Sequence, residues 1–156
     1  MSKMTTDQKE NSDELLQNSI LSKFGITALN PMQEAAREAI SGDGDVVILS
    51  PTGMGKTLAF LLPILAGLNK DSEEIQVLII VPTSELALQI ELVLRDIGTG
   101  HKVNAIYGGR ASAKDKEDLQ HLPSILIGTP GRIADHMNRG SFKSRNINTL
   151  VLDEYD

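Results

Sequence analysis

Short apolar runs alternate with amphipathic stretches along most of the chain. Five runs have the length of a β-strand, at 45–50 (DVVILS), 76–81 (QVLIIV), 102–107 (KVNAIY), 124–128 (SILIG) and 149–153 (TLVLD). Their apolar residues are largely consecutive, which is typical of strands that are buried on both faces. Because helical stretches separate them, the sequence predicts an α/β fold with a mostly parallel sheet flanked by helices. Functional residues are then expected at the carboxyl ends of the strands.

A helix is predicted before the first strand, over residues 12–25 (SDELLQNSILSKFG). Ser12 is expected as its N-cap and Gly25 lies just past its end, with apolar residues at helical spacing between them. The preceding residues, 1–11, are polar. We expect them to form a mobile tail and residues 12–156 to form one folded domain.

Two further helices are predicted around the first strand. Segment 30–42 (NPMQEAAREAISG) places Asn30 at the N-cap, Pro31 at the first helical position and Gln33 at the third, which is the arrangement of a capping box. The most apolar run of the chain, 58–68 (LAFLLPILAGL), has a helical pattern but is well short of the roughly 20 residues that cross a bilayer. A buried helix is therefore expected there.

Composition narrows the class of protein. Of the 156 residues, 40% are hydrophobic and 23% charged, which is typical of a folded globular domain, and no cysteine is present for disulfides or thiolate metal sites. His101, His121 and His136 lack metal-ligand spacing and are expected at the surface or in loops. The N-terminus has no signal-peptide pattern, so a cytoplasmic location is expected. A net charge of 15 − 21 = −6 argues against a broad electrostatic hold on nucleic acid, but permits a few directed contacts.

The segment 50–57 (SPTGMGKT) follows the first predicted strand and leads into an apolar helix, which is the context of a phosphate-binding loop. Glycines let backbone N–H groups turn toward phosphate, a lysine reaches the β and γ phosphates, and a threonine hydroxyl binds Mg²⁺. A glycine-rich turn without a ligand is the alternative. The candidate nucleotide-binding residues here are Ser50, Pro51, Thr52, Gly53, Met54, Gly55, Lys56 and Thr57.

The last predicted strand ends in two acids, Asp153 and Glu154. A phosphate-loop enzyme needs an acid at the end of a second strand, so Asp153 is expected to hold Mg²⁺ through its water shell. Glu154 is placed to act on the attacking water, and we predict Glu154, Asp153 and Lys56 as the catalytic residues. The alternative is a solvated acidic tail.

Six motifs, GITALNPMQ, SPTGMGKT, PTSELALQ, YGG, GTPGR and LDEYD, occur in one order, and together the chain resembles the DEAD-box RNA helicases. The resemblance covers residues 25–156, most of the first of two RecA-like lobes in that family. It implies a RecA-like P-loop NTPase lobe, incomplete at the C-terminus, with ATP and Mg²⁺ as cofactors. It also implies that Gln33 reads the adenine edge; a helix-capping role for Gln33 is the alternative.

The resemblance further implies RNA as the partner, bound as a single strand or short duplex. In that family, loops after the strands contact RNA phosphates and sugars, which conveys little base information. Thr83 and Thr129 are expected as helix N-caps, and Arg132 adds a charge; ordinary capping and turn chemistry is the alternative. The residues implied for RNA contact are Pro82, Thr83, Ser84, Gly108, Gly109, Thr129, Pro130, Gly131 and Arg132.

Some positions depart from the family pattern. Ser84 stands where arginine is usual and Tyr155 where alanine is usual, while Asp153, Glu154 and Asp156 are retained. No aromatic residue within 1–23 is present to stack on adenine.

The predicted function is that of an ATP-dependent RNA helicase, which couples ATP hydrolysis to RNA binding and local duplex unwinding. Residues 1–156 would lack the second lobe and be inactive alone. The family inserts a later strand between the phosphate-loop strand and the acid-bearing strand, so 45–50 and 149–153 are expected to lack partners on facing sides. The alternatives are a DNA translocase of the same superfamily and a non-catalytic ATP-binding interaction module.

Overall fold

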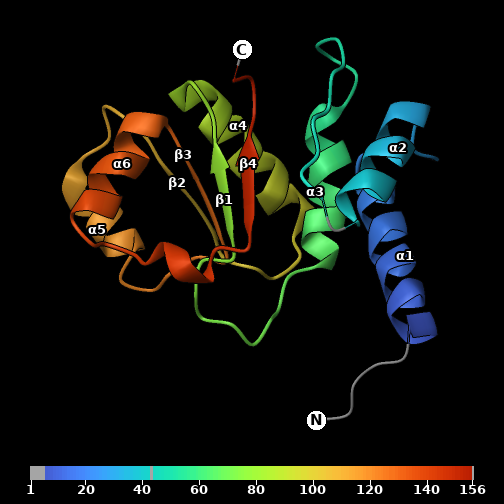
Figure 1. Cartoon of the computed structure of the whole chain (residues 1–156), viewed down its shortest axis with the longest axis horizontal. Helices are drawn as coiled ribbons and strands as arrows, with labels where there is room; N and C mark the ends of the chain where they lie inside the picture. Colours follow the sequence, from blue (N-terminus) through green and yellow to red (C-terminus); the bar gives the residue numbers. More distant parts are fainter. Residues whose placement is uncertain (1–5, 43, 156) are drawn as a thin grey trace. The chain divides into compact units, whose positions relative to one another are not determined.

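A computed structural model describes residues 6–42 and 44–155 of the chain and divides it into two compact units. The first unit reaches to Gly67 and contains three helices, α1 (Thr6–Lys23), α2 (Pro31–Ile40) and α3 (Lys56–Ala66). Helices α2 and α3 pack against each other, and α1 contacts α3 (Figure 1). The predicted apolar helix is thus present as α3, with Pro63 inside it.

Helix α1 starts earlier than predicted. It begins at Thr6, so residues 6–11 of the expected tail are helical and Ser12 is not the N-cap; residues 1–5 lie outside the described part. No glycine or proline precedes Ser12 to stop the helix, and the polar residues there include good helix formers. The predicted end is confirmed: Gly25 has φ +66°, and the N–H of Ile26 donates to the carbonyl of Leu21 at 2.9 Å.

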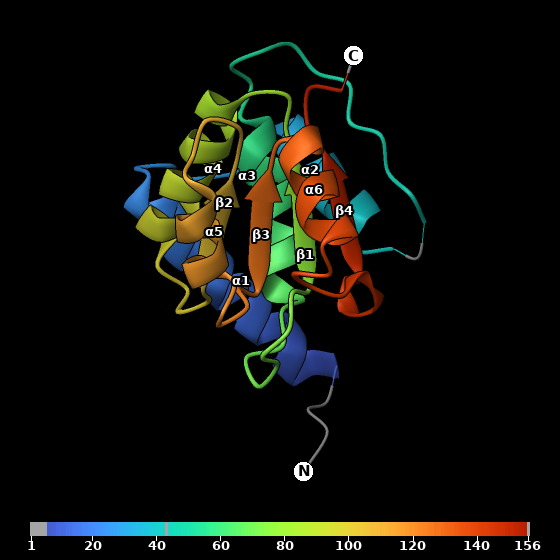
Figure 2. The ribbon, with the colours of Figure 1, turned by 90° about the vertical axis from the view of Figure 1, so that its left-hand side faces the viewer.

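The second unit, from Leu68 onward, is built on a four-stranded parallel sheet. Its strands lie in the order β2-β3-β1-β4, and Leu78 of β1 is in register with Leu126 of β3 and Leu150 of β4 (Figure 2). These strands confirm four of the five predicted runs. Their bounds are β1 Val77–Ile80, β2 Val103–Ile106, β3 Ile125–Gly128 and β4 Thr149–Leu152.

Helices cover both faces of this sheet, as the α/β pattern predicts. Helix α4 (Ser84–Ile97) contacts β2 and β3 on one face, while α5 (Ser112–Asp118) and α6 (Pro130–Asn138) lie on the other, in front in Figure 2. A short 3₁₀ helix, Ser144–Asn146, precedes β4. The core on the α5–α6 side is formed by Ile75, Leu78, Ile106, Leu119, Leu126, Ile133 and Phe142, all buried.

The strand predicted at 45–50 is not formed. This segment has no strand hydrogen bonding among the described residues, and Val47 and Leu49 are 67% and 87% exposed. A strand exists only through pairing, and the order of the described sheet ends at β4, whose second edge has no neighbour. Within the described residues, neither 45–50 nor the second edge of β4 is paired, as expected.

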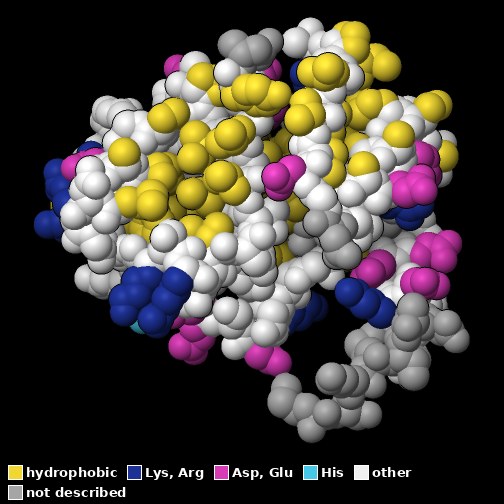
Figure 3. Space-filling model, in the orientation of Figure 1, with side chains coloured by type: hydrophobic (Ala, Val, Ile, Leu, Met, Phe, Trp, Pro, Cys, Tyr) yellow, Lys and Arg dark blue, Asp and Glu magenta, His cyan; other side chains and the backbone are white. Residues whose placement is uncertain are grey.

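Burial of the last strand also differs from the prediction. Leu150 and Leu152 of β4 are 58% and 51% exposed, although the run was expected to be buried on both faces. An edge strand has a neighbour on one side only, so its side chains receive less cover than those of central strands. Apolar side chains are visible over the sheet in the left half of Figure 3. Within the described residues, no helix combines the length and apolarity needed to cross a bilayer.

We expect Gly128→Ala to destabilise the second unit. A Cβ at Gly128 would lie 2.7 Å from both the carbonyl oxygen of Ile106 in β2 and Cδ1 of Ile133 in α6, so β3 would have to shift relative to both elements. Such overpacking costs about 1–3 kcal/mol. The matched control is Gly131→Ala, where the added carbon meets nothing within 4 Å. Hydrogen exchange of the β3 amides in the full-length protein measures the effect; equal protection in the two variants would contradict this packing.

Candidate functional site

The candidate phosphate loop lies in the first unit and depends on two glycines. Gly53 has φ +81° and Gly55 φ +79°, which is the left-handed region that residues with a Cβ rarely adopt. Gly55 is also the N-cap of α3, so the loop runs directly into the first turn of that helix. The free N–H groups and the positive end of the helix dipole at such a terminus favour a phosphate.

Lys56 occupies the first position of α3 and folds back over the loop. Its Nζ donates to the carbonyl of Ser50 at 3.0 Å, which spans the loop from one end to the other. A neutral carbonyl is a weaker partner for an ammonium group than a phosphate oxygen is. The lysine is therefore held within the loop by a bond that a phosphate oxygen would replace readily. Thr57 follows in the same turn of α3.

The capping box predicted at α2 is confirmed. The Asn30 side chain accepts the Gln33 N–H at 2.9 Å, and the Gln33 side chain accepts the Asn30 N–H at 3.0 Å. The same two side chains also hold the phosphate loop, since Asn30 Nδ2 donates to the carbonyl of Met54 at 3.1 Å and Gln33 Nε2 to that of Gly55 at 3.2 Å. The cap of α2 and the backbone of the loop thus form one hydrogen-bonded unit.

Gln33 retains hydrogen-bonding capacity beyond these contacts. A glutamine amide has two donor hydrogens and two acceptor lone pairs, and one of each is used here. One donor and one acceptor remain, the combination that pairs with the edge of adenine. The capping role and a base-reading role are compatible for this residue, although Gln33 is only 4% exposed.

The other candidate residues lie in the second unit, where the parallel sheet gathers them. Because all four strands run the same way, their carboxyl ends meet at one edge of the sheet. The strand order places 108–109 after β2, 129–132 after β3, 82–84 after β1 and 153–154 after β4. The segments implied for RNA contact therefore lie side by side. Asp153 and Glu154 lie at the end of the same edge, after β4. The nucleotide-binding residues belong to the first unit.

Both predicted threonine N-caps are present. The Thr83 hydroxyl accepts the N–H of Leu86 at 3.3 Å, whereas Thr129 is the N-cap of α6 without a side-chain capping bond. Ser84, in place of the usual arginine, donates to the neighbouring Glu85 carboxylate at 3.2 Å. Gly109 has φ +85°, a conformation that favours glycine in the loop after β2.

The two acids differ in conformation. The N–H of Asp153 donates to the carbonyl of Ile80 at 3.0 Å, which continues the pairing of β4 with β1 by one step. Glu154 is exposed and has φ +50°, and it is the one described residue other than glycine with positive φ. A non-glycine residue held there stores about 1–3 kcal/mol of strain, a feature that concentrates at functional sites. Tyr155 is 67% exposed, and Asp156 lies outside the described residues.

The sequence did not predict a buried charged cluster next to these loops. Asp115 of α5 is fully buried and contacts Arg110, Arg132 and His136. The prediction that all three histidines lie at the surface or in loops is wrong for His136, which is 1% exposed within α6 and bonds to Asp115 and Ser141. Asp115 stands among other charged residues in 114–118, so no local pattern distinguishes it.

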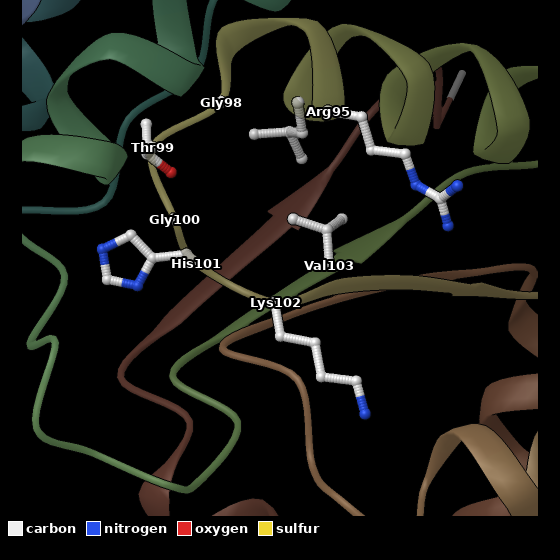
Figure 4. A pocket seen from close by; sticks show the side chains of 8 residues that line it. Arg95, Gly98, Thr99, Gly100, His101, Lys102 and Val103 are labelled. Carbon is white, nitrogen blue, oxygen red and sulfur yellow. The ribbon is translucent and has the colours of Figure 1, made fainter.

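A shallow cavity of about 350 Å³ lies at the opposite, amino edge of the sheet, between the end of α4 and the start of β2 (Figure 4). His101 and Lys102 line it, but their side chains point in different directions, and the Lys102 ammonium donates to the carbonyls of Asp118 and His121. Burial, and secondly the charge of Lys70, lower the pKa of His101 below its ordinary value. None of the predicted site residues lines this cavity.

Among the described residues, no three His, Cys, Asp or Glu side chains are grouped as metal ligands. The two predicted Mg²⁺ ligands, Thr57 of the first unit and Asp153 of the second, carry oxygen atoms, the ligand type that Mg²⁺ prefers.

The chain is similar to proteins of one known family. Residues 30–156 match the model of the DEAD/DEAH box helicase family. The chain is 38% identical over 138 residues to the DEAD-box ATP-dependent RNA helicase CshA of Bacillus subtilis, covering 87% of this chain and 28% of that protein. It is 40% identical over 147 residues to the ATP-dependent RNA helicase CshA of Limosilactobacillus reuteri, covering 93% of this chain and 29% of that protein.

The fold is also similar to a solved structure. The crystal structure of a hypothetical ATP-dependent RNA helicase from Sulfolobus tokodaii matches with a TM-score of 0.77 and 25% sequence identity, over 88% of this chain and 40% of that one. The chain thus spans less than a third of the two curated relatives.

We expect His101 to titrate below 6.5, its ordinary value, in the folded protein. Because the unfolded chain then binds the proton at a higher pH, the contribution of His101 to stability is fully present above 6.5 and is lost as pH falls from 6.5 through the lower pKa of the folded state. Titration of the His101 ring by NMR checks the direction. Lys70→Gln should raise the pKa partway; a wild-type value above 6.5 would contradict the assigned environment.

Proposed function

Because the chain belongs to the DEAD/DEAH box helicase family, we propose that residues 12–156 form the front part of the ATP-binding, RecA-like domain of an ATP-dependent RNA helicase. The supporting observation is the phosphate loop, in which two left-handed glycines precede Lys56 at the first position of α3. The full-length protein would couple ATP hydrolysis to RNA binding and to local duplex unwinding. A second RecA-like lobe would complete the enzyme. A cytoplasmic location remains a prediction.

In this proposal the loop 50–57 binds the ATP phosphates. Its N–H groups and the start of α3 face the phosphate chain, and Lys56 exchanges the Ser50 carbonyl for the β and γ phosphates. Mg²⁺ would be held by the Thr57 hydroxyl and, through water, by Asp153. When bound, the metal supplies positive charge that offsets the charge developing on the transferred phosphate.

Gln33 reads adenine through one amide donor and one amide acceptor. These two groups are not used in its contacts with Asn30 and Gly55. Since its amide also holds the carbonyl of Gly55, base recognition and phosphate binding share one hydrogen-bonded unit. Binding of the correct base would then stabilise the loop that holds the phosphates. A nucleotide without the matching edge would leave a buried polar group unpaired, which costs about 1–3 kcal/mol.

RNA would bind across the segments 82–84, 108–109 and 129–132, which follow three adjacent strands. The chain has a net charge of −6, so broad electrostatic attraction is not available. Directed contacts from N-capped helix starts and glycine turns to the sugar-phosphate backbone suit this balance. They would bind RNA with little dependence on base sequence.

Glu154 would act on the attacking water. It is exposed and has a left-handed backbone conformation just after β4, a strained geometry of the kind that concentrates at functional sites. A DNA translocase of the same superfamily would share these features, and comparison of RNA and DNA as ATPase activators distinguishes the two. A non-catalytic ATP-binding module is kept as a candidate by Tyr155, a bulky residue where the family usually has alanine.

We expect Gln33→Ala to weaken ATP binding by about 1–3 kcal/mol and to leave GTP nearly unchanged, since the lost amide pairs only with adenine. The matched control is Asn30→Ala, which removes the other half of the capping box and the contact to Met54. In this control variant, the affinities for ATP and for GTP should fall equally. Nucleotide titration of the full-length variants measures these affinities. If Gln33→Ala lowered the affinities for ATP and GTP equally, Gln33 would have a capping role only.

We expect single-stranded RNA to stimulate ATP hydrolysis by the full-length protein more than DNA of the same length does. Glu154→Gln should lower turnover on the order of 10²- to 10⁴-fold, the range for loss of a general base, while ATP affinity is retained. Lys56→Ala serves as the comparison, because it should abolish ATP binding itself. Unchanged turnover in Glu154→Gln would contradict the role of Glu154 as general base. Absence of ATP turnover in the wild-type protein would favour the non-catalytic ATP-binding module.

A further inference from the structure

A buried carboxylate connects two of the three segments proposed to face RNA. Asp115 of α5 has no exposed surface, yet both of its oxygens accept charged hydrogen bonds. Arg110 Nη1 donates to Oδ1 at 2.9 Å, and Arg132 Nε donates to Oδ2 at 2.7 Å. Nε2 of His136 lies 3.2 Å from the same Oδ2. Three segments of the chain therefore meet at one side chain.

These partners connect two of the three proposed RNA segments. Arg110 follows Gly109 directly in the loop after β2, and Arg132 lies in the first turn of α6. Arg110 also donates to the carbonyl of Ala105 in β2 at 2.9 Å, which fixes its loop to the sheet. Arg132 Nη2 approaches the carbonyl of Arg110 at 3.4 Å. Asp115 thus ties the loop after β2 to the start of α6.

Both arginines are already neutralised within this cluster. Arg110 also pairs with Asp118, and Nη1 of Arg132 lies 3.7 Å from Asp135. Burial acts to lower the pKa of Arg110, but the hydrogen bond to Asp118 and the charges of Asp118 and Asp115 raise it above its ordinary value. The arginine side chains are only 14% and 16% exposed. An approaching phosphate would therefore find little uncompensated positive charge here.

We propose that Asp115 is a positioning residue for RNA binding, which holds the loop after β2 and the start of α6 as one rigid element, and that Arg132 supports this element and makes no phosphate contact. The inference rests on the proposed RNA-binding function. It assigns the phosphate contacts of these two segments to uncharged groups, such as the main chain at Gly109 and at the α6 terminus. Removing one partner of a buried ion pair leaves the other charge buried without a partner. Replacement of Asp115 or Arg132 therefore makes the loop after β2 and the start of α6 less rigid.

The rival assignment is that Arg132 binds a phosphate directly and that Asp115 only orients or weakens it. The two assignments differ in the salt dependence of RNA binding. Each phosphate neutralised by a basic side chain contributes about −0.7 to the slope of log affinity against log salt concentration for single strands. A positioning residue changes the affinity without contributing to that slope.

The test measures affinity of the full-length protein for a single-stranded RNA oligonucleotide by fluorescence anisotropy, with a non-hydrolysable ATP analogue, over a series of potassium chloride concentrations. Arg132→Gln should weaken RNA binding on the order of tenfold, the lower end of the loss seen when groups that orient metal ligands are removed. The slope of log affinity against log salt concentration should be the same for this variant as for the wild type. A slope shallower by about 0.7 would show a direct phosphate contact and overturn the inference.

Asp115→Asn provides an independent arm. It should weaken RNA binding by a similar factor, and the double variant Asp115→Asn/Arg132→Gln should be no weaker than either single variant, because both remove the same support. If Asp115 only neutralised Arg132, Asp115→Asn would strengthen binding and steepen the slope, which would overturn the inference. The matched control is Asp135→Asn, which removes the same charge from the other side of Arg132, is 33% exposed and should leave affinity nearly unchanged.

Folding is checked by circular dichroism and by ATP binding of each variant. If Asp115→Asn does not fold, the salt slope of Arg132→Gln decides between the assignments by itself. Wild-type protein that binds ATP but no RNA would contradict the proposed function, and the inference with it. Wild-type RNA binding with a shallower slope for Arg132→Gln would contradict the inference alone.

Discussion

Parallel pairing of four strands is the constraint on which the proposed RNA surface depends. In a parallel sheet, every loop that follows a strand emerges at the same edge, so residues far apart in sequence become neighbours. The order β2-β3-β1-β4 places three candidate RNA segments side by side and the acids 153–154 at the end of the row. Buried apolar side chains on both faces hold this order. Each loop then needs only its own turn chemistry to orient its residues.

Hydrogen-bonded frameworks of neighbouring backbone support the candidate residues in both units. In the first unit, the capping box of α2 holds the carbonyls of Met54 and Gly55 in the phosphate loop. In the second unit, the buried carboxylate of Asp115 joins the loop after β2 to the start of α6. Each framework includes a side chain that was not predicted as a ligand contact, Asn30 in the first unit and Asp115 in the second. Rigid support of this kind lowers the ordering cost of binding a flexible ligand.

Local patterns were sufficient to predict much of this structure. Consecutive apolar runs predicted four strands, and the Asn30–Gln33 spacing predicted the capping box, because each depends on residues close in sequence. The segment 45–50 shows the limit, since its apolar pattern is strong but a strand also needs a partner that no local pattern supplies. The burial of His136 and Asp115 was also beyond local patterns, because their contacts join residues 21 positions apart. The family resemblance predicted the site residues, and their roles are proposals.

We propose that RNA lies across the carboxyl edge of the sheet. Hydrogen exchange of the full-length protein, with and without single-stranded RNA in the presence of a non-hydrolysable ATP analogue, measures this directly. We expect slower exchange of backbone amides in 82–84, 108–109 and 129–132, and unchanged exchange at the amino edge, in 98–102. Protection by RNA confined to 98–102, with the three carboxyl-edge segments unaffected, would contradict it.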